Sequence, residues 1–251
     1  MTNVNTNSYT MVFAVAVCVV MSTVLALLAN VLRPIQDASA EFDRQKNVMM
    51  AAGLIERGDP RPRAELEQLY KDRVDERVVD TRTGDVVPGK TAADIKALNE
   101  QAAAEDPTAG KPFRVVAMAK DERQQLDAIV LPVSGKGLWS TLYGYLALES
   151  DGDTVRGITF YKHGETPGLG GEVENPQWTA MWEGKQILGE GGELVSITVK
   201  KGKVDPSIAK EKRHYVDGLA GATITSNGVT KFVRNDLETF RPYLASVAQK
   251  N

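Results

Sequence analysis

The chain has 251 residues, a formal net charge of −3 at pH 7, one cysteine and two histidines. A single cysteine excludes an intramolecular disulfide, and so few cysteines and histidines exclude the ligand clusters of zinc fingers and iron–sulfur proteins. The small net charge gives no reason to expect a nucleic-acid partner, and the composition indicates no metal site. Any redox chemistry must therefore come from a bound organic cofactor or from other chains.

An apolar segment without charged residues extends from Tyr9 to Leu32. About 24 residues at ~1.5 Å each can cross a bilayer core of ~30 Å as a helix. We therefore expect a transmembrane helix at 9–32 after an N-terminal tail at 1–8. A cleaved signal sequence is the alternative, because Ala38-Ser39-Ala40 resembles a cleavage site. The apolar run is too long for a signal core and no Lys or Arg precedes it, which favours a retained anchor.

Residues 33–112 are predicted to form a helical support segment. Helices are expected at about 41–54, 64–79 and 92–104, separated by turns that contain glycine or proline. None of them carries a constellation of reactive side chains.

The pattern changes at Phe113, where short runs of strand-favouring residues begin. Strands are predicted at 113–119, 128–133, 142–148, 155–161 and 194–199, with a hairpin turn at Asp151-Gly152-Asp153. Consecutive strands between groups of helices predict an α+β fold with a mainly antiparallel sheet and flanking helices. A doubly wound nucleotide-binding fold is disfavoured, because no Gly-x-Gly-x-x-Gly element follows a strand. Residues 113–251 are assigned to this region, and 33–251 to one compact domain.

Segment 217–228, DGLAGATITSNG, is predicted to be a loop that delivers hydroxyl groups to the start of a helix. Apolar residues after Val229 recur at three- and four-residue steps, so the helix N-terminus falls near Thr225 or Ser226. Unpaired N–H groups and the helix dipole would stabilise an anion there, and a phosphate is the obvious candidate. The alternative is that Thr225 or Ser226 only caps the helix.

Two glycine-rich loops, 135–140 and 163–171, interrupt the strand region. Taken alone, the first loop is better explained by a core position for Trp139, and the second by a surface turn. Together they could hold a flavin ring, with flat apolar faces from Leu138, Trp139 and Leu169 and hydroxyl groups from Ser140 and Thr166. Backbone N–H groups of 168–171 would add donors that favour the charged reduced forms of a flavin.

Segment 217–225, DGLAGATIT, resembles the motif at which a flavin transferase attaches flavin mononucleotide (FMN) through a phosphoester bond to the last Thr or Ser. That residue aligns with Thr225, while Ala220 stands where the motif often has serine. Six segments of this chain resemble the C subunit of the sodium-translocating NADH:quinone oxidoreductase and occur in the same order. They are GKGLWS (135–140), YGYLAL (143–148), HGETPGLGG (163–171), NPQW (175–178), WEGK (182–185) and the 217–225 motif. ETPGLG and GATIT also resemble the G subunit of the related Rnf electron-transfer complex. LWS, NPQW and the added N-terminal helices favour the quinone reductase.

The resemblance implies an FMN-binding α+β domain and a membrane-anchored electron carrier that is not catalytic alone. It implies a relay from the NADH-oxidising side to a flavin in a neighbouring membrane subunit of a sodium-pumping NADH:ubiquinone reductase. Its partners would be the other membrane, flavin and iron–sulfur subunits, with a flavin transferase during maturation. The family places such a chain in the bacterial inner membrane with a single span and a periplasmic C-terminal domain. The positive-inside rule leans the other way, because Arg33 follows the span and no Lys or Arg precedes it.

The expected site has two parts. The covalent attachment point is Thr225. The expected cofactor-binding residues are Leu138, Trp139, Ser140, Glu165, Thr166, Gly168, Leu169, Gly170, Asp217, Gly221, Ala222, Thr223 and Ser226. Three alternatives remain at this point: the FMN-bearing G subunit of an Rnf-type complex, a cofactor-free membrane-anchored assembly protein, and a flavin-binding sensor or transferase without an electron-transfer partner.

Overall fold

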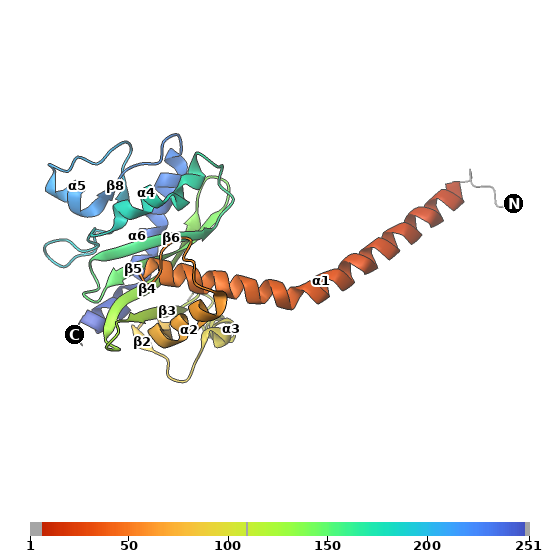
Figure 1. Cartoon of the computed structure of the whole chain (residues 1–251), viewed down its shortest axis with the longest axis horizontal. Coiled ribbons are helices and arrows are strands. Elements are labelled where there is room, and N and C mark those ends of the chain that lie inside the picture. The colour runs from red at the N-terminus through yellow and green to blue at the C-terminus, as the bar shows by residue number, and fades with distance from the viewer. Residues whose placement is uncertain (1–6, 109, 249–251) are drawn as a thin grey trace. The chain divides into compact units, whose positions relative to one another are not determined.

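The computed structural model describes residues 7–108 and 110–248 (Figure 1). The chain divides into two compact units, Met1–Asp43 and Arg44–Asn251. The first six residues of the predicted tail lie outside the described residues, and residues 7 and 8 are already helical.

Helix α1 spans Asn7–Ala51 and contains the predicted apolar segment. Its most apolar 18-residue window has a mean hydropathy of 2.8, and within the described residues it is the one helix long and apolar enough to cross a membrane. The helix continues through Pro34, so the prediction of a separate helix at 41–54 is wrong. A proline removes one backbone hydrogen bond and can kink a helix without ending it when helix-forming residues flank it.

The second unit is built on a six-stranded antiparallel sheet in the order β2-β1-β3-β4-β5-β6 (Figure 1). This confirms the predicted fold class and four of the predicted strands. The hairpin turn between the last two strands is also confirmed, and Gly152 in it has a φ of 71°. The strands are β1 (Val74–Asp80), β2 (Asp85–Val86), β3 (Phe113–Lys120), β4 (Leu126–Lys136), β5 (Thr141–Glu149) and β6 (Val155–Lys162).

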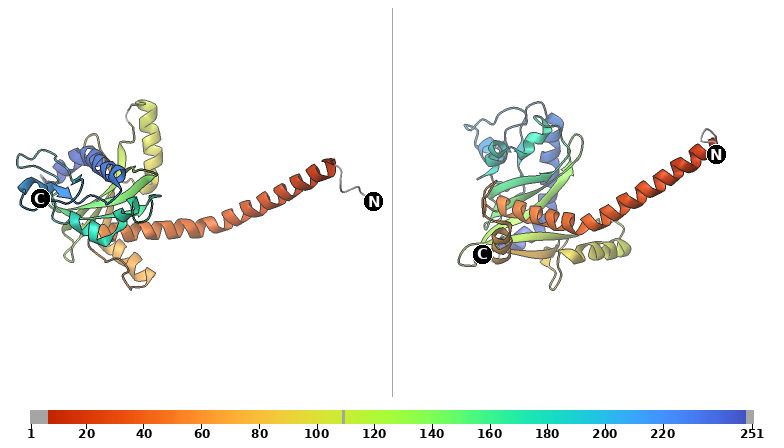
Figure 2. Two further views of the ribbon diagram at one scale, coloured as in Figure 1. Left: turned by 90° about the horizontal axis from the view of Figure 1, so that it is seen from above. Right: turned by 45° about the vertical axis from the view of Figure 1, so that its right-hand side comes forward.

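Helix α6, Thr223–Ala248, packs on one face of this sheet and makes its main contacts with β4 (Figure 2). The side chain of Phe232 lies directly over Gly135, so that any side chain at position 135 would collide with its ring. Alternate residues of the strands complete this core. Its fully buried members include Ile129, Leu131, Leu142, Leu146, Leu148, Phe160, Val229, Val233, Leu237 and Phe240.

The opposite face of the sheet is covered by the last turns of α1. The hydroxyl of Thr159 on β6 donates to the carbonyl of Asn47 at 3.2 Å, and a Cβ on Gly157 would lie 3.0 Å from the carbonyl oxygen of Ala51. Val48 and Met49 are completely buried. Residues 44–51 are therefore part of the folded unit.

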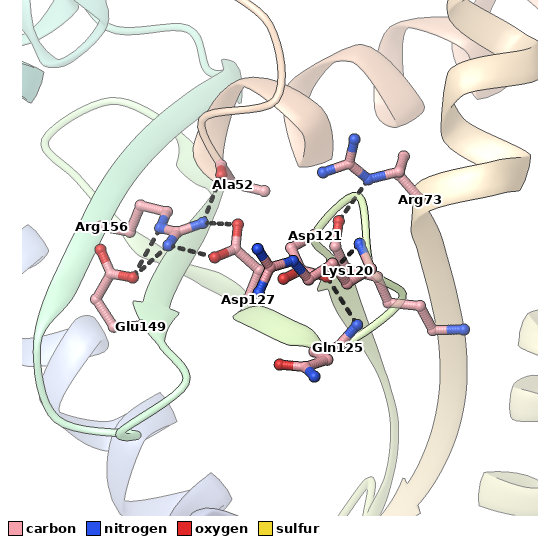
Figure 3. A network of polar contacts seen from close by, with 9 residues as sticks. Ala52, Arg73, Lys120, Asp121, Gln125, Asp127, Glu149 and Arg156 are labelled. Atoms are coloured by element: carbon pink, nitrogen blue, oxygen red, sulfur yellow. Dashed lines mark hydrogen bonds and ion pairs between the residues drawn. The ribbon is translucent and has the colours of Figure 1, made fainter.

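Arg156 on β6 joins the edge of the sheet to the end of α1 (Figure 3). Its guanidinium donates to Asp127 of β4 at 2.9 Å, to Glu149 of β5 at 2.9 Å and to the carbonyl of Ala52 at 3.4 Å. The hydrogen bond to Asp127 raises the pKa of Arg156 and holds the pKa of Asp127 below its ordinary value. One cation thus holds three chain segments together.

The predicted helix at 64–79 is only partly correct. Helix α2 covers Arg63–Arg73, and β1 begins at the next residue. The β-branched residues Val74, Val78 and Val79 favour a strand. β1 also pairs with β3 through seven consecutive residues, and this long-range pairing overrides the local helical spacing.

Two further boundaries differ from the prediction. The strand expected at 194–199 is reduced to β7, Thr198–Val199, which pairs in parallel with β8, Tyr215–Val216. Ser196 has a φ of 67°, in the left-handed region, which breaks an extended chain at that point. The helix expected at 92–104 is confirmed as η1, Ala92–Asp94, and α3, Ile95–Glu105. The remaining short elements are η2 (Gly170–Glu174), α4 (Pro176–Thr179), η3 (Ala180–Trp182) and α5 (Ala209–His214).

Candidate functional site

The hydroxyl group of Thr225 is directed at a carboxylate from a distant part of the chain. Thr225 lies in the first turn of α6, is 1% exposed, and donates from Oγ1 to Oε2 of Glu165 at 2.7 Å. The helix begins at Thr223, earlier than the predicted start at Thr225 or Ser226, because the N–H of Ser226 already bonds to the carbonyl of Ala222. The N–H groups of a first helical turn have no acceptor within the helix. The site therefore combines a buried hydroxyl with a helix N-terminus.

Glu165 is held by the hairpin between β4 and β5. Its carboxylate accepts hydrogen bonds from the backbone N–H groups of Leu138 at 3.3 Å, Trp139 at 2.9 Å and Ser140 at 3.0 Å. Three successive N–H groups pointing inward form an anion-binding concavity. The hydroxyl of Ser140 also accepts the N–H of Gly164 at 2.6 Å, which fixes the segment before Glu165 to the same hairpin. We call Leu138, Trp139, Ser140, Glu165, Gly170 and Thr225 the carboxylate cluster.

The carboxylate of Glu165 is stabilised in its charged form. Burial disfavours the charge, but hydrogen bonds from Thr225 and from the backbone of Ser140, Trp139 and Leu138 outweigh burial and hold the pKa of Glu165 below its ordinary value. Glu165 is 6% exposed. The cluster therefore contains a buried, ionised carboxylate in contact with a hydroxyl group.

Three glycines allow the cluster to pack closely. A Cβ on Gly170 would lie 2.6 Å from Oε2 of Glu165 and 2.7 Å from Oγ1 of Thr225. A Cβ on Gly137 would lie 2.7 Å from Oε1 of Glu165, and one on Gly221 would lie 2.8 Å from Cδ2 of Leu169. Such distances are too short for a carbon atom, so only glycine fits without a shift of its neighbours. The backbone of Gly170 thus packs directly against the Thr225 hydroxyl.

Large apolar side chains next to these residues face solvent. The exposed fractions are 68% for Trp139, 58% for Ile224, 43% for Leu169 and 42% for Leu138. Exposed aromatic and aliphatic side chains gathered beside a polar site are typical of a ligand-binding or docking surface. Leu138, Trp139 and Leu169 are the residues for which the sequence predicts apolar contacts.

Other predicted residues hold the 217–222 loop in place. The carbonyl of Asp217 accepts from Nε1 of Trp178 at 2.8 Å, and its side chain accepts from the N–H of Val204 at 2.8 Å. The hydroxyl of Ser226 accepts the N–H of Leu219 at 3.2 Å and so ties the loop to the helix. Ala222 is buried just before the helix.

The remaining three predicted residues lie on the surface. Thr166 and Thr223 are exposed, and exposed Gly168 has a φ of 74°, a left-handed conformation that glycine adopts without strain. Each lies one or two residues along the chain from a member of the cluster. Their side chains and backbone are therefore accessible to a ligand bound over the cluster.

The sequence places Glu165 among the cofactor-binding residues but does not predict its pairing with Thr225, which is 60 residues away along the chain. The role of Gly137 was also missed, because its spacing from Gly135 does not by itself indicate room for a carboxylate. The sequence indicates Trp178 only as part of the NPQW segment that resembles the family, and it does not predict the hydrogen bond from Trp178 to Asp217.

One cavity in the described part of the chain lies apart from this cluster. Within residues 7–108 and 110–248, no group of three or more His, Cys, Asp or Glu side chains is arranged to hold a metal ion. A cavity of ≈ 380 Å³ is lined by Met50, Arg156 and Glu183, among others, and contains no member of the carboxylate cluster.

Comparison with known proteins places these features in a family. The FMN-binding domain family matches residues 137–238, a range that contains the whole carboxylate cluster. The chain is 42% identical over 241 residues to the C subunit of the Na(+)-translocating NADH-quinone reductase of Pseudomonas aeruginosa, and the match covers 91% of this chain and 90% of that protein. It is 37% identical to the corresponding protein of Haemophilus ducreyi, over 97% of this chain and 95% of that protein.

Solved structures agree with the sequence comparisons. The crystal structure of the C subunit of the Na(+)-translocating NADH-quinone reductase from Parabacteroides distasonis superposes with a TM-score of 0.67 at 29% identity, covering 85% of this chain and 96% of that one. The crystal structure of Shewanella oneidensis NqrC gives a TM-score of 0.68 at 29% identity, covering 84% and 99%. This chain therefore belongs to the NqrC family, the C subunits of the Na(+)-translocating NADH-quinone reductase.

Proposed function

We propose that this protein carries FMN in a phosphoester bond to the hydroxyl of Thr225 and relays electrons within the reductase complex. The electrons would arrive one at a time from the NADH-oxidising side and leave to a flavin in a neighbouring membrane subunit. The remaining subunits are the proposed partners, and a flavin transferase is the proposed partner during maturation.

The buried Thr225 hydroxyl at the start of α6 is the observation that carries this proposal. A phosphoester at Oγ1 keeps one negative charge, and the N-terminus of a 26-residue helix favours an anion at this position. Gly170 and Gly221 leave the loops beside this hydroxyl without side chains. The helix N-terminus therefore suits a phosphate attached at Thr225, and the close contacts of Gly170 and Glu165 with Oγ1 mean that these neighbours would have to shift to admit it.

Side chains beside the cluster would hold the rest of the group. Leu138, Trp139 and Leu169 offer exposed apolar surface for a flat ring. Ser140, Thr166 and the backbone of residues 168–170 are the proposed polar contacts. Asp217, Ala222 and Ser226 would act by holding the loop and the first turn of α6 in place, and Thr223 is a proposed contact on their exposed surface.

Bound FMN would supply the one-electron and two-electron redox chemistry that no side chain of this chain provides. The protein contributes the attachment point and the apolar surface. A covalent bond also prevents loss of the carrier to an aqueous compartment.

Helix α1 is proposed to anchor the protein in the bacterial inner membrane, with residues 44–251 in the periplasm. The length and hydropathy of α1 support the anchor, and the family resemblance supports the orientation. Protease added to intact spheroplasts should digest the folded unit. Protection until the cells are lysed would reverse the orientation.

The attachment is tested by mass spectrometry of the tryptic peptide His214–Lys231 from cells that contain the flavin transferase. The wild-type peptide should carry the mass of FMN, and Thr225→Ala should abolish both that mass and the flavin fluorescence of the denatured chain. Thr225→Ser keeps a hydroxyl and should retain some flavin. Thr223→Ala is the matched control, because Thr223 is exposed and lies two residues upstream in the same turn. A wild-type peptide of unmodified mass would leave the cofactor-free assembly protein as the better description.

A further inference from the structure

We infer that Glu165 is the proton acceptor for Thr225 when the flavin is attached, so that this chain supplies a catalytic residue for its own modification. The inference rests on the proposed function, because it concerns how the Thr225 phosphoester forms. It assigns to the acceptor protein a chemical role in a reaction that a transferase would catalyse.

The geometry already has the form of a hydroxyl nucleophile with its base. Oγ1 of Thr225 donates its hydrogen to Oε2 of Glu165 at 2.7 Å, within the range expected for a general base and the proton that it removes. With the hydrogen directed at Glu165, the lone pairs of Oγ1 remain available for a phosphorus atom. Both residues are buried, so water competes little for the proton.

The hairpin keeps the carboxylate in position and ionised. Three backbone N–H groups, from Leu138 to Ser140, fix its two oxygens. The neighbouring imidazole, that of His163, accepts the backbone N–H of Glu165 through Nδ1 at 3.2 Å, and its Nε2 lies 2.9 Å from Oε1 of Glu174. The imidazole of His163 thus lies against the Glu165 backbone and Glu174, and Glu165 is the base in contact with the Thr225 hydroxyl.

The reaction balances with a flavin nucleotide in which FMN is joined to a nucleoside monophosphate through a phosphoanhydride. Oγ1 of Thr225 forms a bond to the FMN phosphorus, and the bond from that phosphorus to the bridging anhydride oxygen breaks. The nucleoside monophosphate leaves with the electron pair of that bond, and the hydroxyl proton passes to Oε2 of Glu165. No electron is exchanged with an oxidant or reductant. The protonated carboxyl group can then donate a hydrogen bond to the new ester oxygen.

A carboxylate can take the hydroxyl proton in a transfer to phosphorus. Protein kinases use an aspartate to accept the proton of the substrate hydroxyl in the same way. A buried carboxylate already bonded to the hydroxyl meets that requirement.

The test measures the initial rate of covalent attachment on the full-length chain, purified without flavin and incubated with purified flavin transferase and flavin adenine dinucleotide. Flavin fluorescence of the denatured chain reports the product. Glu165→Gln keeps the length and an acceptor oxygen for the hairpin but removes the base, and Glu165→Asp keeps the carboxylate but shortens it. Glu172→Gln is the matched control, because Glu172 accepts from Asn175 at 2.7 Å in the adjoining segment. Thermal unfolding of each variant is recorded in parallel.

We expect Glu165→Gln to slow attachment by about 100-fold or more, within the range of general acid–base catalysis. Glu165→Asp should react faster than Glu165→Gln, and Glu172→Gln should match wild type. A purely structural role for Glu165 predicts the reverse order, since Gln preserves the hairpin contacts better than Asp does. If Glu165→Gln attaches flavin as fast as Glu165→Asp or faster, the inference is overturned, whichever of the two variants is less stable. A wild-type chain that gains no flavin would instead overturn the proposed function.

Discussion

Replacing Gly170 by alanine would place a methyl group inside the carboxylate cluster. The new carbon would lie 2.6 Å from Oε2 of Glu165, 2.7 Å from Oγ1 of Thr225 and 3.0 Å from Cβ of Glu165. Overpacking of this kind costs about 1–3 kcal/mol. For a unit of this size, each kcal/mol lowers Tm by ~2–4 °C, so we expect a fall of roughly 2–12 °C. The displaced hydroxyl should also lose most of its covalent flavin.

The control for Gly170→Ala is Gly168→Ala, two residues away in the same loop. A Cβ on Gly168 has no atom within 4 Å, so this change adds only the strain of a left-handed backbone, about 1–2 kcal/mol. It should lower Tm by a smaller amount and leave flavin attachment intact. Thermal unfolding followed by circular dichroism and flavin fluorescence of the denatured chain check both variants. A Gly170→Ala protein with wild-type Tm and wild-type flavin content would refute the packing argument.

Two further predictions concern the folded unit. Arg156→Gln leaves Asp127 and Glu149 without their shared cation and should reduce the free energy of unfolding by about 1–2 kcal/mol at pH 7, an estimate discounted for the partly exposed partners. Because the folded-state pKa of Asp127 is lowered, this contribution is complete above the ordinary Asp pKa near ~4 and is lost as the pH falls through the lower folded value. Urea titrations of the variant and of wild type measure the difference between their free energies of unfolding, and a difference that stays constant down to about pH 2 would contradict this prediction. A chain that starts at Gln36 should unfold cooperatively, whereas one that starts at Gly53 lacks the buried Val48 and Met49 and should aggregate. Gel filtration and thermal unfolding compare the two chains, and equal stability would show that the end of α1 is dispensable.

The parts of the fold that sequence could predict are those set by local pattern. The four strands between Phe113 and Lys162 alternate or are apolar throughout, and α6 shows one apolar stripe, so local pattern predicts both. The segment 74–79 was misassigned because Leu66, Tyr70 and Val74 continue a helical spacing across the true boundary. Pairing with β3 decides that segment, and strand pairing between distant residues leaves little trace in local periodicity.

Local sequence pattern indicated the segments that form the candidate site but not the contacts between them. Hydroxyl and glycine residues before an amphipathic helix indicated Thr225 or Ser226, and only the resemblance to the flavin-attachment motif selected Thr225. The two glycine-rich loops indicated the neighbouring residues. The hydrogen bond between Thr225 and Glu165 joins residues on a helix and on a loop that follows a different strand. Their contact depends on the antiparallel order of β4, β5 and β6 and on the position of α6 over β4, which no local pattern specifies.

The rigidity of Thr225 determines how far an attached group can reach. Its backbone belongs to a long helix, its branched Cβ restricts rotation about χ1, and its Oγ1 is aligned by Glu165. The Oγ1 atom therefore has little conformational freedom of its own, and if FMN is bonded to it as proposed, any swing of the cofactor would come from the bonds beyond Oγ1. The ribityl phosphate arm of FMN would then set the volume that its ring can search, with Oγ1 as the pivot. A serine at position 225 would loosen that pivot, because it lacks the methyl group that restricts χ1.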